Sequence, residues 1–240
     1  MRHERTPRQA CSASVQGVTS VKPPPKDSPA PLRAHRAASP QPVTERGRRT
    51  RAALIEASRK VFAERGYLEA TIGDITLAAD VAHGTFYTYF ESKHDLFREA
   101  LDSVLAEFLA EARALPSTAQ DVYSRIERAN RGYLRAYQRN AKLMGVLEQA
   151  AIMDPELKDI RLTARRYWVE RAELNIEKWQ EAGLARADIN AGYAANALGA
   201  MVDRCCFLWL VLGEPFEEEL AVKSLTQLYV NALGIEPKPG

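Results

Sequence analysis

From about Glu45 to Leu233, apolar residues recur at the three- and four-residue spacing of amphipathic helices. No segment of this stretch shows the two-residue alternation that marks a half-buried strand. One clear case lies between residues 119 and 139, where the spacing alternates between four and three through Val122, Ile126, Ala129, Tyr133 and Tyr137. The pattern predicts an all-α fold with about nine helices, three in front and a larger helical bundle behind.

Residues that start or stop helices divide the stretch into these nine segments. Gly66, Gly183 and Gly213 are natural stops, because glycine readily takes the backbone conformation that ends a helix. Ser92 and Asp154, the latter followed by a proline, are typical helix starts. The predicted helices are Glu45–Arg65, Ile72–Ala79, His83–Phe90, Lys93–Arg113, Ala119–Arg139, Lys142–Ile152, Glu156–Glu181, Asn190–Leu212 and Phe216–Leu233.

The second and third predicted helices are short and follow a longer one, which is the plan of a helix-turn-helix unit. Thr71 is the expected N-cap of the second helix, and Asp74 three positions later completes the spacing of a capping box. Residues 80–82 form the predicted turn. Phe86 and Phe90 are four residues apart on the third helix, so we expect both to face the core.

The remaining side chains of the third helix suit contact with a nucleic-acid duplex. Hydroxyl groups and backbone amides at a helix N-terminus bind phosphates and fix the register on DNA, and Thr85 and Tyr87 supply hydroxyls there. His83 and Thr88 can reach base edges or thymine methyl groups. Gly84 allows a backbone to approach closely. Each aromatic residue taken alone is more often a core residue, so the prediction rests on the whole pattern.

The stretch from residue 57 to residue 97 resembles the TetR family of transcriptional regulators. The resemblance is carried by the runs Val61–Tyr67, Ala70–Ile75, Ala79–Phe90 and Ser92–Phe97. It is long and specific, but it covers only about the first fifth of the predicted folded part. It implies a DNA-binding transcriptional regulator, with a repressor as the expected type.

By position, the resemblance implies roles for individual residues. Phosphate contacts are implied for Thr85, Tyr87 and Lys93, and Thr71 and Gly73 open the helix that leans on the DNA backbone. The positions that face the major groove are His83, Gly84, Thr88 and Tyr89. Ala82 departs from the pattern, because the family often has a Ser or Thr N-cap there. A lost cap typically costs about 1 kcal/mol, so the reading helix is expected to be less firmly held.

Basic residues are concentrated in the front part of the chain. Residues 1–65 hold 14 Lys and Arg against 5 Asp and Glu, a net charge of +9, whereas residues 66–240 hold 19 against 26, a net of −7. This asymmetry indicates that the front meets a polyanion. Arg46, Arg48, Arg49 and Arg51 form the expected arm on phosphates or in a minor groove. A solvated basic segment without a partner is the other open interpretation.

Residues 1–44 differ in composition from the rest of the chain. They contain eight of the 13 prolines, together with Ser, Gln and scattered Arg. Such a segment buries too little apolar surface to offset the entropy lost on ordering, so we predict disorder. The predicted organisation is therefore a disordered tail at 1–44, a helix-turn-helix domain at 45–92, and a helical domain for effector binding and dimerisation at 93–240.

The function of this last domain is implied by the resemblance, since such regulators dimerise there and hold a small molecule between helices. The small-residue helix at 190–212 and the final helix are the expected dimer contacts, because small residues let helices approach closely. A symmetric dimer presents two helix-turn-helix domains, or reading heads, about 34 Å apart. This arrangement predicts a palindromic double-stranded DNA operator.

Candidate ligand-binding residues are the aromatic, apolar and isolated polar residues of the rear half, the mixture that ligand sites show. They are Met144, Leu147, Glu148, Met153, Tyr167, Trp168, Arg171, Arg204, Phe207 and Trp209. Plain core packing is the more frequent role of such residues. Arg204 stands in an otherwise apolar stretch, so its charge needs a partner. A protein partner such as Glu148 is expected ahead of an anionic ligand, and the aromatic walls favour an apolar, lipid-like or drug-like effector.

Other classes of protein fit the sequence less well. There is no glycine-rich phosphate loop, CxxC or HExxH motif, and the four histidines fall in the tail and the helix-turn-helix region, so no enzyme, metal or cofactor is predicted. Cys11, Cys205 and Cys206 form no disulfide framework, because one lies in the tail and the others are adjacent. A redox sensor at the adjacent pair and a helical interaction protein without an effector remain as alternatives.

Membrane and secretory classes also find no support in the sequence. No apolar run approaches the roughly 18–20 residues of a membrane span. The N-terminus has no apolar segment of the kind found in a secretory signal. The expected location is the cytoplasm.

Overall fold

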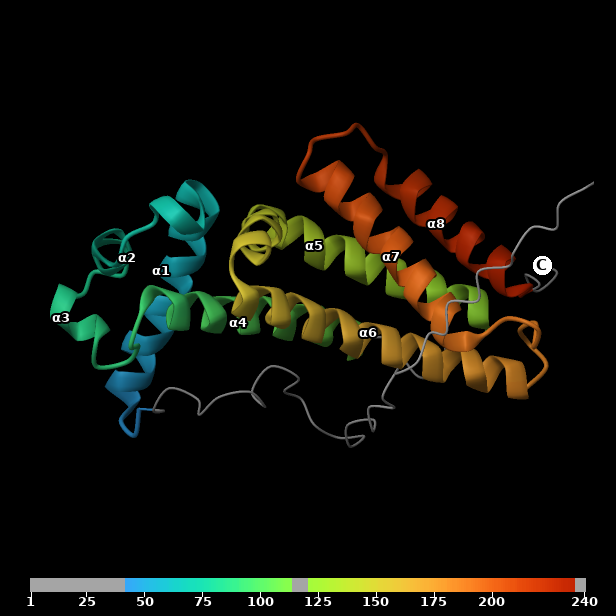
Figure 1. The fold of residues 1–240 in the computed structure, drawn as a ribbon, viewed down its shortest axis with the longest axis horizontal. Helices are drawn as coiled ribbons and strands as arrows, with labels where there is room; N and C mark the ends of the chain where they lie inside the picture. The colour runs from blue at the N-terminus through green and yellow to red at the C-terminus, as the bar shows by residue number, and fades with distance from the viewer. Residues whose placement is uncertain (1–41, 114–120, 236–240) are drawn as a thin grey trace, which may run out of the picture.

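The computed structural model describes residues 42–113 and 121–235, and these ranges contain eight helices and no strand. The predicted all-α class is confirmed. α1, α2 and α3 lie at one end of an elongated molecule, α5 to α8 form the other end, and α4 extends from the small end into the bundle (Figure 1). The helices are α1 (Glu45–Glu69), α2 (Ile72–Ala78), α3 (His83–Phe86), α4 (Lys93–Arg113), α5 (Val122–Met153), α6 (Pro155–Glu181), α7 (Ala191–Leu210) and α8 (Glu218–Leu233).

The predicted tail at 1–44 lies outside the described residues, except for its last three positions. One predicted boundary is wrong, because α5 is a single helix where Ala119–Arg139 and Lys142–Ile152 were expected as two. Asn140 sits at the expected break. Its side-chain amide donates to the Ala136 carbonyl at 2.9 Å and to Glu107 at 3.0 Å, so this polar residue is satisfied inside a continuous helix.

The third helix is also shorter than predicted, since α3 ends at Phe86 and residues 87–89 form a turn. The amides of Thr88 and Tyr89 bond the carbonyls three residues back, at 3.2 and 2.9 Å. Bonds of this kind tighten the chain and are typical of a helix end. The reading helix is therefore one α-helical turn followed by a tighter one.

The signals that start and stop the front helices behave as predicted. Thr71 Oγ1 accepts a hydrogen bond from the Asp74 amide at 3.1 Å, and Asp74 Oδ2 accepts from the Thr71 amide at 3.1 Å, which completes the capping box. Gly66 takes a φ of +76° and interrupts α1 near its end. Asp80, with a φ of +52°, makes the turn between α2 and α3. Aspartate tolerates this left-handed region better than most residues.

The main hydrophobic core runs across the predicted domain boundary at residue 92. Leu54 and Phe62 of α1, Phe97 of α4, and Tyr137 and Leu147 of α5 are almost fully buried in one cluster. Burying a large apolar side chain contributes about 1.5–3 kcal/mol. The end of the molecule that holds α1 to α3, here called the reading end, therefore packs directly against the bundle and is not joined to it by a flexible linker.

A polar contact joins three helices beside this core. The Arg59 guanidinium of α1 lies 2.7 Å from Glu107 Oε1 of α4 and donates to Asn140 Oδ1 of α5 at 2.8 Å. Burial would raise the pKa of the Glu107 carboxyl, but hydrogen bonds from Asn140 and Arg59 lower it. These bonds fix the angle at which α1 meets the bundle.

Candidate functional site

The residues predicted to meet DNA lie mostly at the surface of the helix-turn-helix unit. Phe86 and Phe90 face the core, 0% and 2% exposed, as predicted. Tyr87 is 57% exposed, although it follows Phe86 directly. A methyl group added to Gly84 would meet nothing within 4 Å, so the surface is open where a duplex would approach. Of the other candidates, Thr71, Gly73, His83 and Thr88 are exposed, whereas Thr85 and Tyr89 are half-buried.

The start of α3 has no side-chain cap. Ala82 occupies the N-cap position with an extended backbone, and no side chain accepts a hydrogen bond from the first turn. The α-helical part that follows is only four residues long. The hydroxyl-bearing face of α3 is therefore held by the burial of Phe86 and by the turns on either side, and not by a local cap.

The basic arm contains three exposed arginines and one buried arginine. Arg46, Arg48 and Arg49 are exposed, and Glu45 pairs with the last two at 2.8 and 3.2 Å. Arg51 is only 8% exposed, and its Nη2 lies 2.7 Å from Glu99 Oε2 of α4. The placement of Arg51 corrects the sequence-based expectation, because the Arg51 side chain points into the protein.

The contact between Arg51 and Glu99 is an ion pair by distance, but it does not have hydrogen-bond geometry, and Arg51 Nε has no acceptor among the described residues. The guanidinium also lies 5.1 Å from the centre of the Phe90 ring. Arg51 thus joins α1, α4 and the end of the reading unit. It is a packing residue and not a member of the exposed arm.

Lys93 is likewise occupied within the protein. Its ammonium group donates to the carbonyls of Tyr67, Leu68 and Ala70 at 2.8, 3.1 and 2.8 Å, and lies 4.9 Å from the centre of the Tyr67 ring. An ammonium group has three donors, and here each has a carbonyl acceptor. In the structure the ammonium group therefore caps the end of α1, at a position where the sequence predicts a phosphate contact.

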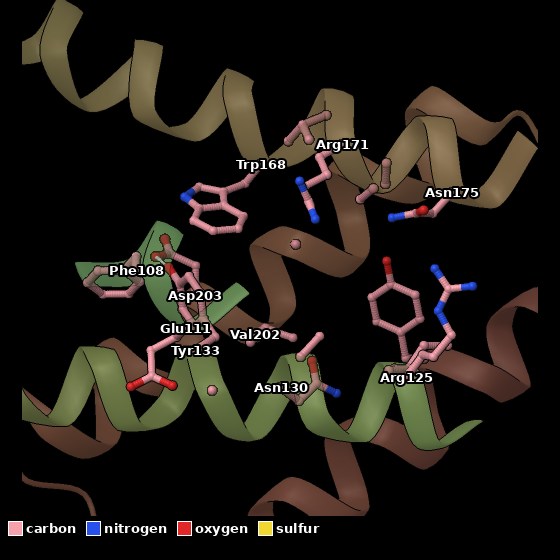
Figure 2. Close-up of a pocket in the computed structure, with 18 of the residues that line it drawn as sticks. Phe108, Glu111, Arg125, Asn130, Tyr133, Trp168, Arg171, Asn175, Val202 and Asp203 are labelled. Carbon is pink, nitrogen blue, oxygen red and sulfur yellow. Dashed lines mark hydrogen bonds between the residues drawn. The ribbon is translucent and has the colours of Figure 1, made fainter. Parts of the chain in front are cut away.

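A cavity of about 390 Å³ lies in the bundle, with walls from α5, α6 and α7, two residues from α4 and one from α8 (Figure 2). Small residues on the facing helices leave this space, and Gly199 is an example, because a methyl group added there would meet nothing within 4 Å. The small lining residues are Ala129, Gly132, Ala172, Ala195 and Gly199. A volume of this size is within the range of small-molecule sites.

One end of the cavity is aromatic. Phe108 of α4 meets Tyr133 of α5 edge-on with ring centres 5.1 Å apart, and Tyr133 lies 6.4 Å from Trp168 of α6. Phe108 is 3% exposed. Figure 2 shows these three rings gathered around Asp203 of α7. A flat or extended apolar group would find favourable edge and face contacts there.

A charge network closes this aromatic end. The Tyr133 hydroxyl donates to Asp203 Oδ1 at 2.6 Å, and Arg161 Nη2 donates to Asp203 Oδ2 at 2.6 Å. Arg161 also donates to Glu148. Burial first, and then the adjacent Asp203, raise the pKa of the Tyr133 hydroxyl well above its usual value. Each charge here therefore has a partner inside the protein.

The other end of the cavity is basic. Arg125 of α5 lines the cavity across from Arg171 and Asn175 of α6 (Figure 2). Arg125 and Arg171 are exposed, so this end is the mouth. The guanidinium of Arg125 lies 5.9 Å from the ring centre of Trp179. The cavity thus offers aromatic surface inside and positive charge at its opening.

Of the ten predicted ligand-binding residues, Trp168 and Arg171 line the cavity. The other eight do not line this cavity, and their places in the structure explain why. Met144 and Leu147 are core residues, and Met153 is 61% exposed at the end of α5. Tyr167 meets Trp168 edge-on with ring centres 5.4 Å apart, but it is not part of the wall.

Among the remaining four, Glu148 is the partner of Arg161. Trp209 stacks on Phe216 with ring centres 5.2 Å apart. Arg204 is exposed, and its guanidinium lies 4.6 Å from the Phe207 ring, so the expected carboxylate partner is absent among the described residues. The charged residue that faces inward is Asp203, one position earlier.

Sequence reasoning missed the basic mouth and most of the wall, including Phe108, Asn130 and Val202. One signal was available. The face of α5 that carries Ile126, Ala129 and Tyr133 also carries Arg125 and Gly132, and a basic residue beside two small ones is unusual for a core face.

The adjacent cysteines have the character of packing residues. Cys206 is fully buried and Cys205 is half-buried. Burial raises the pKa of both thiols, and the nearby Asp203 adds to the effect on Cys206. The thiolate is the reactive form of cysteine, so these positions disfavour the redox-sensor alternative. Cys11 lies outside the described residues.

Within residues 42–113 and 121–235, no cluster of three His, Cys, Asp or Glu side chains is placed to hold a metal ion. No helix in the same ranges is long and apolar enough to cross a membrane.

Comparisons with known proteins agree with this geometry. Residues 54–100 match the family described as bacterial regulatory proteins, tetR family. The chain is 31% identical over 152 residues to the HTH-type transcriptional repressor DhaR of Mycobacterium sp. (strain GP1), covering 60% of this chain and 74% of that protein. It is 23% identical to the regulator EthR of Mycolicibacterium smegmatis, covering 80% and 94%.

The fold has a counterpart among solved structures. A TetR-family transcriptional regulator of Syntrophomonas wolfei superposes with a TM-score of 0.66 at 19% identity, covering 80% of this chain and 98% of that one. This likeness covers most of the chain, whereas the family match is limited to residues 54–100.

Proposed function

The chain belongs to the TetR family of bacterial transcriptional regulators, and on that premise we propose that it is a homodimeric repressor whose operator binding is controlled by a small molecule. The observation that carries this proposal is α4. It begins at Lys93, which caps the end of α1, and it places Phe108 in the wall of the cavity. One rigid element therefore touches both the reading head and the ligand space.

The proposed DNA surface is the exposed face of α2, α3 and the start of α1. Thr85 and Tyr87 offer hydroxyls to phosphates, and the open surface at Gly84 admits a base edge or sugar. The exposed arginines 46, 48 and 49 reach the flanking backbone or minor groove. The other proposed contacts are Thr71, Gly73, His83, Thr88 and Tyr89. Arg51 and Lys93 are left out, because both are occupied within the protein.

The proposed control is a two-state one. A ligand in the cavity presses on Phe108, and α4 passes the displacement to α1 through the ion pair of Glu107 with Arg59. If the ligand binds better to a conformation with separated reading heads, it draws the population away from DNA. A repressor acts on the chromosome, so we also propose a cytoplasmic location.

The proposed dimer uses the outer faces of α7 and α8. Tyr193 of α7 is 83% exposed, and Leu220 and Leu228 of α8 are 60% and 54% exposed. Exposed apolar side chains on neighbouring helices are typical of an interface between subunits. Two subunits joined there would present two reading heads to a palindromic double-stranded operator.

The reading head is tested by the double change Thr85→Ala with Tyr87→Phe. It removes two hydroxyls and leaves the buried Phe86 untouched, so the protein should stay folded and lose at least tenfold in affinity for its operator. The measurement is a gel shift on the intergenic DNA upstream of the protein's own gene. Unchanged binding by the folded variant would refute the proposed surface.

The control by ligand is tested by filling the cavity. Gly199→Leu places a side chain where the structure leaves open space. We expect this variant to bind the operator with the affinity of the wild type. A compound that releases the wild type from the operator should not release the variant. Native mass spectrometry of the protein purified from its host would identify such a compound. A filled variant that still responds would place the effector elsewhere.

A further inference from the structure

The polarity of the cavity constrains the chemistry of its ligand. The inner end is formed by Phe108, Tyr133 and Trp168, and the mouth by Arg125 and Arg171. Figure 2 shows Arg125 at the side of the space away from Phe108 and Tyr133, with Arg171 between Trp168 and Asn175. A ligand that uses both ends must have an apolar body and a polar head that favours guanidinium groups.

The two arginines at the mouth have no carboxylate partner among the described residues. Arg171 makes no hydrogen bond or ion pair there, and Arg125 has only its contact with the Trp179 ring, 5.9 Å away. Asn175 stands beside them with an amide that can donate or accept a hydrogen bond. The mouth therefore lacks one component, a group with negative charge.

The carboxylates that line the cavity cannot supply this charge. Glu111 pairs with Arg139 at 2.7 Å, and Asp203 is held by Arg161 and Tyr133. Of the other cations of the wall, Arg165 donates to the carbonyl and side-chain oxygens of Asn196 at 3.1 and 2.6 Å, and Arg128 donates to the Ser124 carbonyl at 3.1 Å. Arg125 and Arg171 at the mouth are therefore the cations of the wall that make no side-chain hydrogen bond among the described residues.

We propose that the effector is an amphipathic carboxylate, with an aryl or alkyl body among the three inner rings and its carboxylate held by Arg171 and Arg125. A guanidinium group matches a carboxylate in two parallel hydrogen bonds, and such charge-assisted bonds are about twice as strong as neutral ones. This inference rests on the proposed function, since it takes the cavity as the effector site. It adds a charged head to the apolar, lipid-like or drug-like effector expected from the sequence.

The charge of the head is tested by direct binding without DNA. The probes are 3-phenylpropionate and octanoate, each paired with its neutral amide of the same shape, titrated by calorimetry at pH 7.5 into the wild-type protein. We expect each carboxylate to bind at least about tenfold more tightly than its amide, because only the carboxylate gains the charge-assisted bonds. Comparing the affinities of 3-phenylpropionate and octanoate shows whether an aryl or an alkyl group fits better among the inner rings.

The position of the head is tested with two charge-matched double variants. The first, Arg125→Met with Arg171→Met, removes both cations of the mouth. The control, Arg135→Met with Arg166→Met, removes exposed arginines from the same two helices outside the cavity. We expect the first variant to bind carboxylate and amide equally, and the control to keep the wild-type preference. A thermal melt of each variant confirms that it is folded.

Several outcomes would overturn the inference. They are equal or tighter binding of the amides by the wild type, a preference for carboxylates that survives in the mouth variant, and no binding of any probe at millimolar concentration. The proposed function fails separately. Carboxylates that bind at the mouth without changing operator affinity would refute ligand control, whereas a neutral compound that releases DNA would support ligand control and refute the carboxylate.

Discussion

The reading end and the bundle use their basic side chains in different ways. At the reading end, Arg51 and Lys93 stand where the sequence suggests DNA contacts, yet a carboxylate holds one and three carbonyls hold the other. In the bundle, Arg125 and Arg171 face a cavity without a carboxylate partner among the described residues. The basic residues near the DNA surface thus include structural ones, and the bundle holds cations that are free to bind a ligand.

The difference teaches that the role of a cation depends on whether the fold supplies its counter-charge. A paired and buried cation that is removed leaves its partner unsatisfied, and stability falls. An exposed cation without a partner can be removed with little effect on stability, and the change then lowers only the affinity for a ligand or for DNA. Each region therefore predicts a different readout for the same kind of substitution.

The largest effect on stability is expected for Arg51→Met. The change leaves Glu99, whose side chain is 15% exposed, without its counter-charge, and breaking such a pair costs about 3 kcal/mol. Urea unfolding measures this loss. Arg49→Met is the matched control, because Arg49 is 81% exposed and its pair with Glu45 lies at the surface. We expect about 0.5 kcal/mol or less from that control.

A second variant separates the charge from the packing at this position. Arg51→Met with Glu99→Leu leaves no charge buried, and apolar replacement of a buried pair is often neutral or stabilising. We expect the double variant to recover most of the stability that Arg51→Met loses. If Arg51→Met instead keeps the stability of the wild type and loses operator affinity, Arg51 contacts DNA and is not a structural residue.

A smaller loss is expected for Lys93→Met. It removes the three hydrogen bonds that the carbonyls at the end of α1 accept. A hydrogen bond to a charged group contributes about 1.5–3 kcal/mol to stability. We expect a loss of about 2 kcal/mol. Lys60→Met is the control, since Lys60 is exposed on the same helix, α1.

The salt dependence of operator binding decides whether Lys93 also reaches DNA. A lysine that neutralises a phosphate adds about one to the slope of log affinity against log salt concentration. We expect the slope of Lys93→Met to equal that of the wild type. A slope reduced by about one would show that Lys93 leaves the carbonyls when DNA binds.

Alkaline pH should act on the bundle through its buried tyrosines. Burial raises the pKa of Tyr229 from 10.0 to about 12. Because the folded-state pKa is the higher one, the stabilisation is complete below pH 10 and is lost as the pH rises toward 12. At pH 11 the loss from this residue is about 1.4 kcal/mol. Unfolding at pH 9 and pH 11 should show that Tyr229→Phe removes this part of the loss, and equal losses in both proteins would contradict it.

The features that the sequence predicts correctly are those decided by neighbours within a few residues. The capping box of Thr71 and Asp74, the stop at Gly66 and the inward positions of Phe86 and Phe90 all follow from local spacing. Short-range hydrogen bonds and side-chain periodicity determine these features, and both can be read along the chain.

The cavity could not be predicted in this way, because it depends on how three helices are rotated against one another. Asp203 and Arg204 are neighbours, and neighbouring side chains on a helix point about 100° apart, so only the rotation of α7 decides which one faces inward. Ala195 and Gly199 belong to the small-residue helix expected at the dimer interface, yet they line the cavity. Small residues predict a close approach or a space, and periodicity does not say which.

The smallest effect concerns the start of the reading helix, where the two regions differ again. The long helices α5, α6 and α7 each begin with a side-chain cap, from Asp121, Asp154 and Asn190, whereas Ala82 gives α3 none. Ala82→Ser restores a hydroxyl acceptor for the first turn and should stabilise it by about 1 kcal/mol.

Because α3 is short, this stabilisation should act mainly on the DNA-free protein, whose reading helix would otherwise fray. Operator affinity should then rise about two- to fivefold, since less ordering is left to be done on binding. Hydrogen exchange at the amides of Thr85 and Phe86 should slow in the free protein, while exchange in α5 stays the same. Unchanged exchange at α3 would mean that the packing of Phe86 already holds the helix. Faster dissociation from the operator would contradict the expected rise in affinity.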